Sequence, residues 1–483
     1  MRNLTLFLLL FFVVEVFAQP KDDKLMGVIR TQPFFKNAGI SICVSDVLSD
    51  SVLWSYQPEL CMVPASVQKL ITSATALEVF GADMRFETVV WFNGTIESRK
   101  LSGDLVVTGG GDPTLGSGFF CKQGEQQDFL AQWVHRFRQA GIDTITGDIV
   151  VDPFIFSDND VPQSWLYEDV GNHFGAAATG LAIFDNVFCM EFNVPDTPGQ
   201  PAILAKVFPD IPNLSIDNKV FSSSINSDQA YVFGSTFNSD RLVKGTLPAG
   251  AKGFVVKASM PDPAVVLANQ LLRVLTDSSV VFLGKIEQRK VADIQQIEKS
   301  KVLIRQLSPA LSAIIDMMNK ESDNLFAETL LKHLGLKLLG DGSTLAGCKA
   351  ITSYWNSKEI GKNALFVSDG SGLSRLDAFS SGTLANLLVY MKKTSAWSDA
   401  FEQSIPLAGV EGTQKSYFQQ SPVKGRIRAK TGSMTRVRSM AGYMLTQRGH
   451  NVAFSVLLNN YSGSGSTVKK EIEKIVELIY SEL

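Results

Sequence analysis

The chain has 483 residues, of which 45% are hydrophobic and 19% charged, and its formal net charge is −3. A near-neutral chain lacks the broad positive field that phosphate binding requires, so we expect no nucleic-acid partner. At this length more than one folding unit is expected.

The N-terminus has the pattern of a signal peptide. Arg2 precedes an apolar run over residues 4–14, and residues 16–18 form a small-X-small cleavage site. The run is shorter than the roughly 20 apolar residues of a spanning helix. We therefore expect an exported protein, periplasmic or secreted, cleaved after Ala18, and peripheral membrane contact is not predicted. Because Glu15 lies close to the cleavage site, a retained anchor is the alternative.

The cysteine content permits at most two disulfides in an exported chain and leaves one thiol over. Their spacing assigns no pair, and burial as small apolar residues is the alternative. Because no two of them have Cys-X-X-Cys spacing, a structural zinc site is not indicated, and we expect no metal and no cofactor. The five are Cys43, Cys61, Cys121, Cys189 and Cys348.

The first elements predicted are a hairpin and a helix. Residues 38–47 alternate as a strand does, and residues 51–56 read as its hairpin partner. From Pro64 to Gly81 apolar residues recur at helical spacing, which places Ser66 in the first helical turn.

The middle of the chain has a different hydrophobic pattern. Residues 86–258 consist of short apolar runs separated by Gly, Pro, Asn and Asp, which is typical of a β-rich region. After Pro263 the helical period returns over 265–275, and again over 311–320 and 325–335, on either side of Ser322.

The C-terminal end predicts two long strands, 438–446 and 451–460, followed by an amphipathic helix. The apolar face of that helix consists of Val468, Ile472, Ile475, Val476 and Ile479. The simplest organisation is an α/β domain made of residues 27–85 and 260–483, interrupted by a β-rich insertion over 86–259.

Three short motifs stand in one order along the chain, and together they indicate an acylating serine enzyme. They are Ser66-Val67-Gln68-Lys69, Ser322-Asp323-Asn324 and Lys430-Thr431-Gly432. Any one of them alone would be weak. A Ser-X-X-Lys sequence by itself is as well explained by a helix start with a solvated lysine.

The first motif places its two reactive groups together, because residues three apart on a helix share one face. Lys69 can take the proton of Ser66 if burial and a neighbouring cation, for which Lys430 is the candidate, lower the pKa of its amine. The N–H groups of Ser66 and Ser433 are the candidate oxyanion donors.

Residues 426–432 alternate like a strand, whose edge can hold an extended peptide. Lys430 and Thr431 would then meet the terminal carboxylate of the substrate. The alternative for the basic residues of this region is a solvated edge, which we expect for most of Lys424, Arg426, Arg428, Lys430, Arg436 and Arg438.

Other hydrolytic chemistries lack their residues. None of the histidines His135, His173, His333 and His450 belongs to a His-Glu-X-X-His motif or a recognisable triad, and no Gly-X-Ser-X-Gly elbow is present. Residues 109–113 lack the Gly-Lys-Ser/Thr ending of a phosphate loop, so a tight turn is expected there.

On these motifs the chain resembles the low-molecular-mass class C penicillin-binding proteins, which are D-Ala-D-Ala carboxypeptidases and endopeptidases. The resemblance covers nearly the whole mature chain and includes Pro64-Ala65-Ser66, residues 103–115, 147–152 and 369–375, and Gly412-Thr413. Ser66 and Ser322 are 256 residues apart, against 108 from Ser322 to Lys430. A long first gap marks this family, in which two extra domains are inserted there, and argues against a β-lactamase.

The resemblance implies a penicillin-binding serine transpeptidase-like fold and a role for each motif. Ser66 attacks the D-Ala-D-Ala carbonyl of peptidoglycan stem peptides and Lys69 takes its proton. Ser322 together with Asn324 relays protons and holds the acyl chain, and Lys430 and Thr431, next to Gly432, receive the terminal carboxylate. β-Lactams would acylate the same serine and leave it slowly.

The resemblance also implies a site for the free end of the stem peptide. Its residues would be Leu373, Arg375 and Met434, with Asp169 of the insertion facing a diaminopimelate amino group. An ordinary turn acid is the alternative for Asp169. For the whole protein, the alternatives are a catalytically silent cell-wall-binding relative and a β-lactamase or esterase on the same scaffold.

Overall fold

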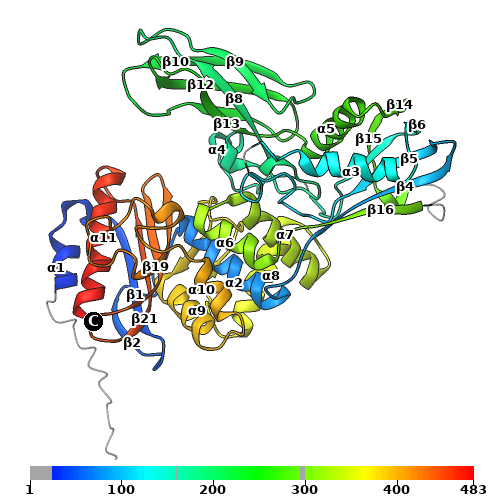
Figure 1. Cartoon of the computed structure of the whole chain (residues 1–483). Coiled ribbons are helices and arrows are strands. Elements are labelled where there is room, and N and C mark those ends of the chain that lie inside the picture. The colour runs from blue at the N-terminus through cyan, green and yellow to red at the C-terminus, as the bar shows by residue number, and fades with distance from the viewer. Residues whose placement is uncertain (1–23, 123, 159, 294–299) are drawn as a thin grey trace, which may run out of the picture.

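The computed structural model describes residues 24–122, 124–158, 160–293 and 300–483. The expected signal peptide, residues 1–18, lies outside this range. Within the described ranges, no helix combines the length and apolar character needed to cross a membrane. One part of the fold is built from both ends of the chain and the other from its middle (Figure 1).

The first part contains an antiparallel five-stranded sheet with the order β19-β20-β21-β1-β2. Because β1 pairs with β21 along its whole length, the two ends of the chain meet in one sheet. The strands predicted at the two ends of the sequence are confirmed. They are β1 (Gly39–Asp46), β2 (Val52–Tyr56), β19 (Ile427–Met434), β20 (Val437–Leu445) and β21 (Asn451–Asn459).

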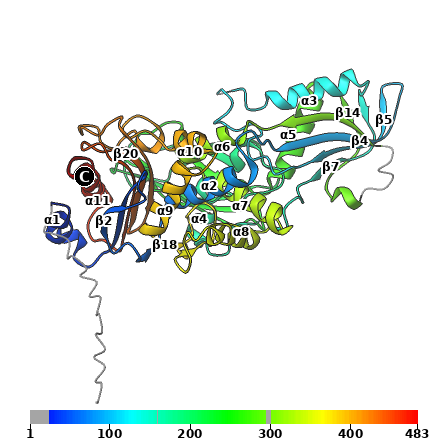
Figure 2. The same cartoon turned by 90° about the horizontal axis from the view of Figure 1, so that it is seen from below.

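Helices cover both faces of this sheet (Figures 1 and 2). α1 (Lys24–Thr31) packs on α11 (Gly465–Glu482), whose five predicted apolar residues are all buried. α9 packs on β1 and β21. The other helices of this part are α2 (Gln68–Phe80), α6 (Leu311–Glu321), α7 (Asn324–Leu339), α8 (Thr344–Ser357), α9 (Ser381–Lys393) and α10 (Ser398–Ser404).

A small sheet with the order β17-β18-β3 completes the first part. Its strands are β3 (Cys61–Met62), β17 (Leu365–Phe366) and β18 (Ala378–Ser380). It links the segment just before the motif serine to the segment around residues 369–375.

The second part, the insertion, contains a seven-stranded sheet in which the path β14-β6-β5-β4-β16 is joined by β7 and β15. The helices α3 (Asp128–Gln139) and α5 (Pro263–Asp277) pack on each other, and α5 also contacts β7, β14 and β15. The strands are β4 (Glu87–Glu97), β5 (Lys100–Thr108), β6 (Thr144–Ile145), β7 (Ile149–Asp152), β14 (Val281–Phe282), β15 (Ile286–Gln288) and β16 (Ser300–Leu307).

Two three-stranded sheets, β13-β8-β9 and β10-β12-β11, form the rest of the insertion and share a hydrophobic core with the seven-stranded sheet. The short helix α4 (Tyr167–Val170) contacts β11. The strands are β8 (Val187–Asn193), β9 (Ile203–Phe208), β10 (Ser215–Ser223), β11 (Tyr231–Gly234), β12 (Asp240–Pro248) and β13 (Phe254–Ser259).

The predicted boundary of the insertion at residue 260 is wrong. Strand β16 pairs with β4, so the insertion's sheet extends to residue 307. Helix α5 buries its apolar face in the insertion's core and not beside α2. Helical periodicity predicts that a helix has an apolar face but not which core receives it, and this is why the boundary was placed too early.

Candidate active site

Ser66 lies in a single 3-10 turn, Ala65–Val67, that leads directly into α2. The sequence predicted that Ser66 lies in the first turn of the helix, whereas in the structure it precedes the first residue of α2, Gln68, by two positions. Ala65 has a φ of 50°, a left-handed conformation that costs energy for a residue with a side chain. Such strain next to a reactive side chain is typical of functional sites.

Lys69 is fully buried in the first turn of α2 and its Nζ lies 3.2 Å from the Ser66 Oγ. Its other two neighbours are the Asn324 Oδ1 at 2.6 Å and the Ser371 carbonyl oxygen at 2.8 Å. Both of these atoms can only accept hydrogen bonds. A neutral amine therefore spends its two N–H groups on them and turns its lone pair towards the one neighbour that carries a proton, Ser66.

Burial lowers the pKa of Lys69 from 10.5 to about 8. Nearby acids act in the opposite direction, with Asp369 the strongest, followed by Asp323 and Glu328. With this pKa, a substantial fraction of the Lys69 side chains is neutral near physiological pH, as a general base for Ser66 requires.

The second motif occupies the junction of α6 and α7. Ser322 ends α6 with a φ of 63°, and the Asp323 carboxylate caps α7 by accepting from the Phe326 N–H. Asn324 is the first residue of α7, and its Nδ2 donates to the Phe174 carbonyl of the insertion at 2.8 Å. Its other end accepts from Lys69, which fixes the orientation of the amide.

Lys430 of β19 completes the cluster of the three motifs. Its buried Nζ lies 2.8 Å from the Ser322 Oγ and 3.0 Å from the Thr431 carbonyl oxygen. Burial, and then the charge of Lys69, lower the pKa of Lys430 well below its usual value. On the next residue, the Thr431 hydroxyl lies 3.5 Å from that of Thr413.

Gly432 explains why the third motif ends in glycine. A Cβ at this position would lie 2.2 Å from the Ser439 Oγ, 2.7 Å from the Pro64 carbonyl oxygen and 2.9 Å from the Ser66 amide nitrogen. The backbone of β19 therefore packs so closely against the turn that carries Ser66 that position 432 has no room for a side chain.

We expect Gly432→Ala to slow acylation by penicillin by at least roughly a hundredfold, because displacing the strand or the turn by about 1 Å misaligns the reacting groups. The rate is measured by intact mass against time. Gly27→Ala is the matched control, since a Cβ there meets no atom within 4 Å. A wild-type rate for Gly432→Ala would contradict this account.

The edge of β19 is free where the substrate is expected. Residues 406–408 pair beside its first half, through the bonds from the Ala408 N–H to the Ile427 carbonyl and from the Ala429 N–H to the Pro406 carbonyl. On the edge of β19 that faces away from β20, no strand among the described residues pairs with residues 430–434. Ser433 is exposed on this stretch.

Of the residues expected to recognise the stem peptide, Met434 and Arg375 lie at the far end of β19. Leu373 and Arg375 follow one loop, Met434 ends the strand, and the Arg375 Nη1 reaches the Thr435 carbonyl at 3.5 Å. Asp169 is half-buried on α4, and burial raises the pKa of its carboxyl group, whereas the charge of Arg375 lowers it. A cavity of about 490 Å³ is lined by Arg375 and Thr435 among others.

The remaining basic residues of this region mostly form a solvated edge, as expected: Lys424, Arg426 and Arg436 are exposed, whereas Arg428 and Arg438 are half-buried. All five cysteines lie in the described ranges and are unpaired. No group of three or more His, Cys, Asp and Glu side chains is arranged to hold a metal ion within the described ranges.

The motifs did not reveal a second set of site residues, namely three carboxyl groups buried behind Lys69. They belong to Glu328, Asp369 and Asp377. Burial raises the pKa of Glu328 to about 8 and that of Asp377 well above its usual value. The sequence held two signals for them: Asp369 opens the stretch 369–375 of the resemblance, and Glu328 is an acidic residue within the largely apolar stretch 325–335.

Comparison with known proteins shows which family the whole chain matches. The model of the D-Ala-D-Ala carboxypeptidase 3 (S13) family matches residues 23–482. The chain is 26% identical to the D-alanyl-D-alanine carboxypeptidase DacB of Haemophilus influenzae over 94% of this chain and 92% of that protein. It is 28% identical to the D-alanyl-D-alanine carboxypeptidase of Actinomadura sp., over 91% of this chain and 81% of that protein.

Solved structures agree in fold. The crystal structure of penicillin binding protein 4 (dacB) from Haemophilus influenzae superposes with a TM-score of 0.81 at 25% identity, covering 95% of this chain and 100% of that chain. The same protein complexed with a β-lactam gives a TM-score of 0.75 at 24% identity. The predicted α/β fold of the penicillin-binding type, with an inserted region, is confirmed.

Proposed function

The chain belongs to the D-Ala-D-Ala carboxypeptidase 3 (S13) family, and on that premise we propose that it trims peptidoglycan stem peptides through an acyl-enzyme on Ser66. It is a serine-type D-alanyl-D-alanine carboxypeptidase. The observation that carries the residue roles is the contact network in which Lys69 links Ser66 to Asn324, and Lys430 contacts Ser322.

The reaction begins when the neutral Lys69 amine takes the Ser66 proton and the hydroxyl oxygen attacks the carbonyl of the D-Ala-D-Ala bond. The N–H groups of Ser66 and Ser433 stabilise the oxyanion. Lys430 and Thr431 bind the terminal carboxylate, whose negative charge favours the protonated form of Lys430 and so keeps Lys69 neutral.

Departure of D-alanine needs a proton on its nitrogen. The Ser322 hydroxyl accepts from Lys430 and so keeps its own O–H free to donate to that nitrogen. Ser322 regains the proton that Lys69 took from Ser66, and this leaves the Lys69 amine neutral again. Water then hydrolyses the acyl-enzyme with Lys69 again as the base. For Asn324 to hold the acyl chain as well, its Nδ2 must exchange the Phe174 carbonyl for a substrate carbonyl.

The two parts of the fold have separate tasks in this proposal. Residues 24–85 and 308–483 carry the chemistry, and the insertion, residues 86–307, forms two subdomains: one with the seven-stranded sheet and one with the two smaller sheets. The insertion supplies Asp169 for the free amino group of the stem peptide. We also propose that the protein is exported, with cleavage after Ala18.

D-Alanine release from two pentapeptides tests this function, one with a free diaminopimelate amino group and one with that group acetylated. The wild-type enzyme should release D-alanine from both and prefer the free amine. Asp169→Asn should lower kcat/KM for the free amine by roughly tenfold, the value of a charged hydrogen bond, and leave the acetylated peptide unchanged.

Glu168→Gln is the matched control, because the neighbouring Glu168 is exposed. An Asp169→Asn variant that retains the preference would remove Asp169 from substrate recognition. A folded wild-type enzyme that releases no D-alanine from either peptide would overturn the proposed substrate.

A further inference from the structure

The loop of residues 368–374 packs against the nucleophile helix through its carbonyl groups. The Ser371 carbonyl accepts from the Lys69 Nζ at 2.8 Å, and the Gly370 carbonyl accepts from the Thr72 hydroxyl at 2.6 Å. The Ser371 contact is one of the two acceptors that turn the lone pair of Lys69 towards Ser66. The position of this loop therefore helps to set the orientation of the Lys69 amine.

Asp369 folds the loop. Its buried carboxylate accepts hydrogen bonds of 2.6 Å from the N–H groups of both Gly372 and Ser374. Gly372 has a φ of +80°, and a Cβ there would lie 2.1 Å from the Ala65 carbonyl oxygen. The loop is thus pressed against the turn of the nucleophile and has no room to shift towards it.

Glu328 holds the same loop from the side of α7. Its buried carboxyl group accepts from the Gly370 N–H at 3.0 Å and from the Ser371 N–H at 2.8 Å. With these N–H groups turned towards carboxyl groups, the carbonyls of the loop face α2. Hydrogen bonds in a buried site are strong because no bulk water competes for them, so the two carboxyl groups hold the loop firmly.

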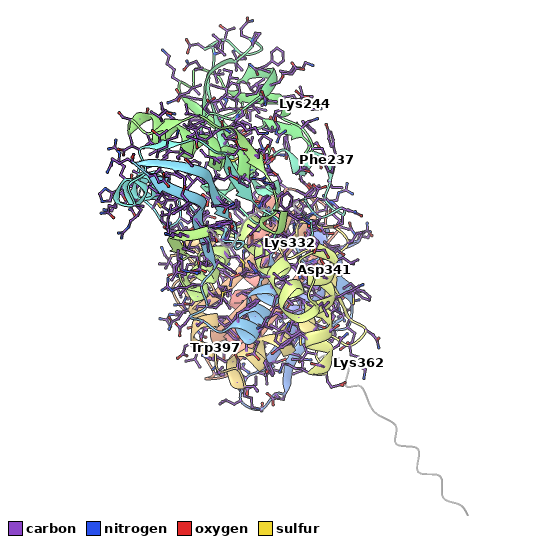
Figure 3. All side chains as sticks on the ribbon, turned by 90° about the vertical axis from the view of Figure 1, so that its right-hand side faces the viewer. Phe237, Lys244, Lys332, Asp341, Lys362 and Trp397 are labelled. Atoms are coloured by element: carbon purple, nitrogen blue, oxygen red, sulfur yellow. The ribbon has the colours of Figure 1, made fainter. Side chains whose placement is uncertain are left out.

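The insertion contributes one hydrogen bond to this arrangement. The Trp165 Nε1 donates to the Asp369 Oδ2 at 2.8 Å, and the indole is buried. The segment that carries Trp165 is itself anchored to α7, because the buried Lys332 Nζ donates to the carbonyls of Asp158 and Ala178, each at 2.9 Å. Figure 3 shows Lys332 at the junction of the two parts.

We propose that Trp165 is a positioning residue for the general base: through Asp369 and the Ser371 carbonyl it holds Lys69 in the orientation that deprotonates Ser66. The inserted region thereby takes part in the chemistry as well as in recognition. This inference rests on the proposed role of Lys69.

The test is the rate of acylation by penicillin at saturating and subsaturating concentrations. Trp165→Phe removes the N–H group and keeps most of the ring, so the maximal acylation rate constant should fall by roughly tenfold, the effect of losing a hydrogen bond to a charged group. The half-saturating concentration should not change, because Trp165 does not contact the ligand in this account.

Trp133→Phe is the matched control. Trp133 is a buried tryptophan of the insertion whose Nε1 lies 3.4 Å from the Gln306 Oε1, away from the loop. It should acylate at the wild-type rate. A Trp165→Phe variant that behaves like Trp133→Phe, or that changes only the half-saturating concentration, overturns the proposal.

A second pair of variants decides the matter if Trp165→Phe does not fold. Glu328→Gln keeps an oxygen that accepts from the loop and should acylate within roughly threefold of the wild type, whereas Glu328→Leu leaves two buried N–H groups without an acceptor and should be slowed by more than roughly tenfold. Equal rates for the two variants would overturn the proposal. A wild-type enzyme that penicillin does not acylate would instead contradict the proposed function.

Discussion

Replacing Ser66 with alanine will abolish the covalent penicillin adduct and leave the fold intact. The alanine keeps the 3-10 turn and the buried surroundings but removes the hydroxyl that lies 3.2 Å from the Lys69 Nζ. Loss of the nucleophile of a serine hydrolase lowers the rate by roughly a millionfold, so no adduct should form on the time scale of the experiment. Intact mass followed by peptide mapping measures it.

Ser73→Ala is the control for this experiment. Ser73 lies in α2, about two helical turns beyond Ser66. Its hydroxyl donates to the carbonyl groups of Lys69 and Leu70, so its loss removes a nearby hydroxyl that takes no part in the reaction. This variant should form the adduct on the peptide that contains Ser66. An adduct on Ser66→Ala would assign the nucleophile elsewhere, and a folded wild type without an adduct would favour a silent cell-wall-binding relative.

Much of the fold could be predicted because its signals are local. The alternation of β1, β20 and β21 and the apolar face of α11 each appear within one stretch of sequence. The motif trio also predicted that three distant segments share one site, in which the structure brings together Lys69 and Asn324, 255 residues apart, and Lys430 and Ser322, 108 residues apart. That prediction rested on the resemblance and not on periodicity.

What could not be predicted depends on contacts between distant segments. α5 has the same period as the helices of the catalytic part, and only its packing on α3, β7, β14 and β15 assigns it to the insertion. Asp369 has no local signal for its contact with Trp165, 204 residues earlier in the chain. A buried carboxylate is recognised by its hydrogen-bond partners, and these become known only once the chain is folded.

The two buried lysines need opposite charge states, because Lys69 must be neutral to act as a base and Lys430 must be charged to bind a carboxylate. Burial lowers the pKa of both amines, and the charge of Lys69 lowers that of Lys430 further. The ligand carboxylate is expected to bind at Lys430, which contacts Ser322 and Thr431. Its negative charge therefore favours the protonated form of Lys430 over that of Lys69. Lys69 is then the group whose loss of a proton limits acylation.

The acylation rate should therefore rise with pH and level off above about 8, the pKa of Lys69. The active form is the deprotonated amine, so each pH unit below that value should lower the rate about tenfold, and the rate at pH 6 should be about a hundredth of the plateau.

Lys69→Ala should be slower by about a thousandfold and should lose this rise, because general-base catalysis is removed. Burial brings the pKa of Asp323 to about 6 and that of Glu328 to about 8, so any rise that persists in Lys69→Ala belongs to those acids. A wild-type profile that is flat between pH 6 and 8 would rule out Lys69 as the base.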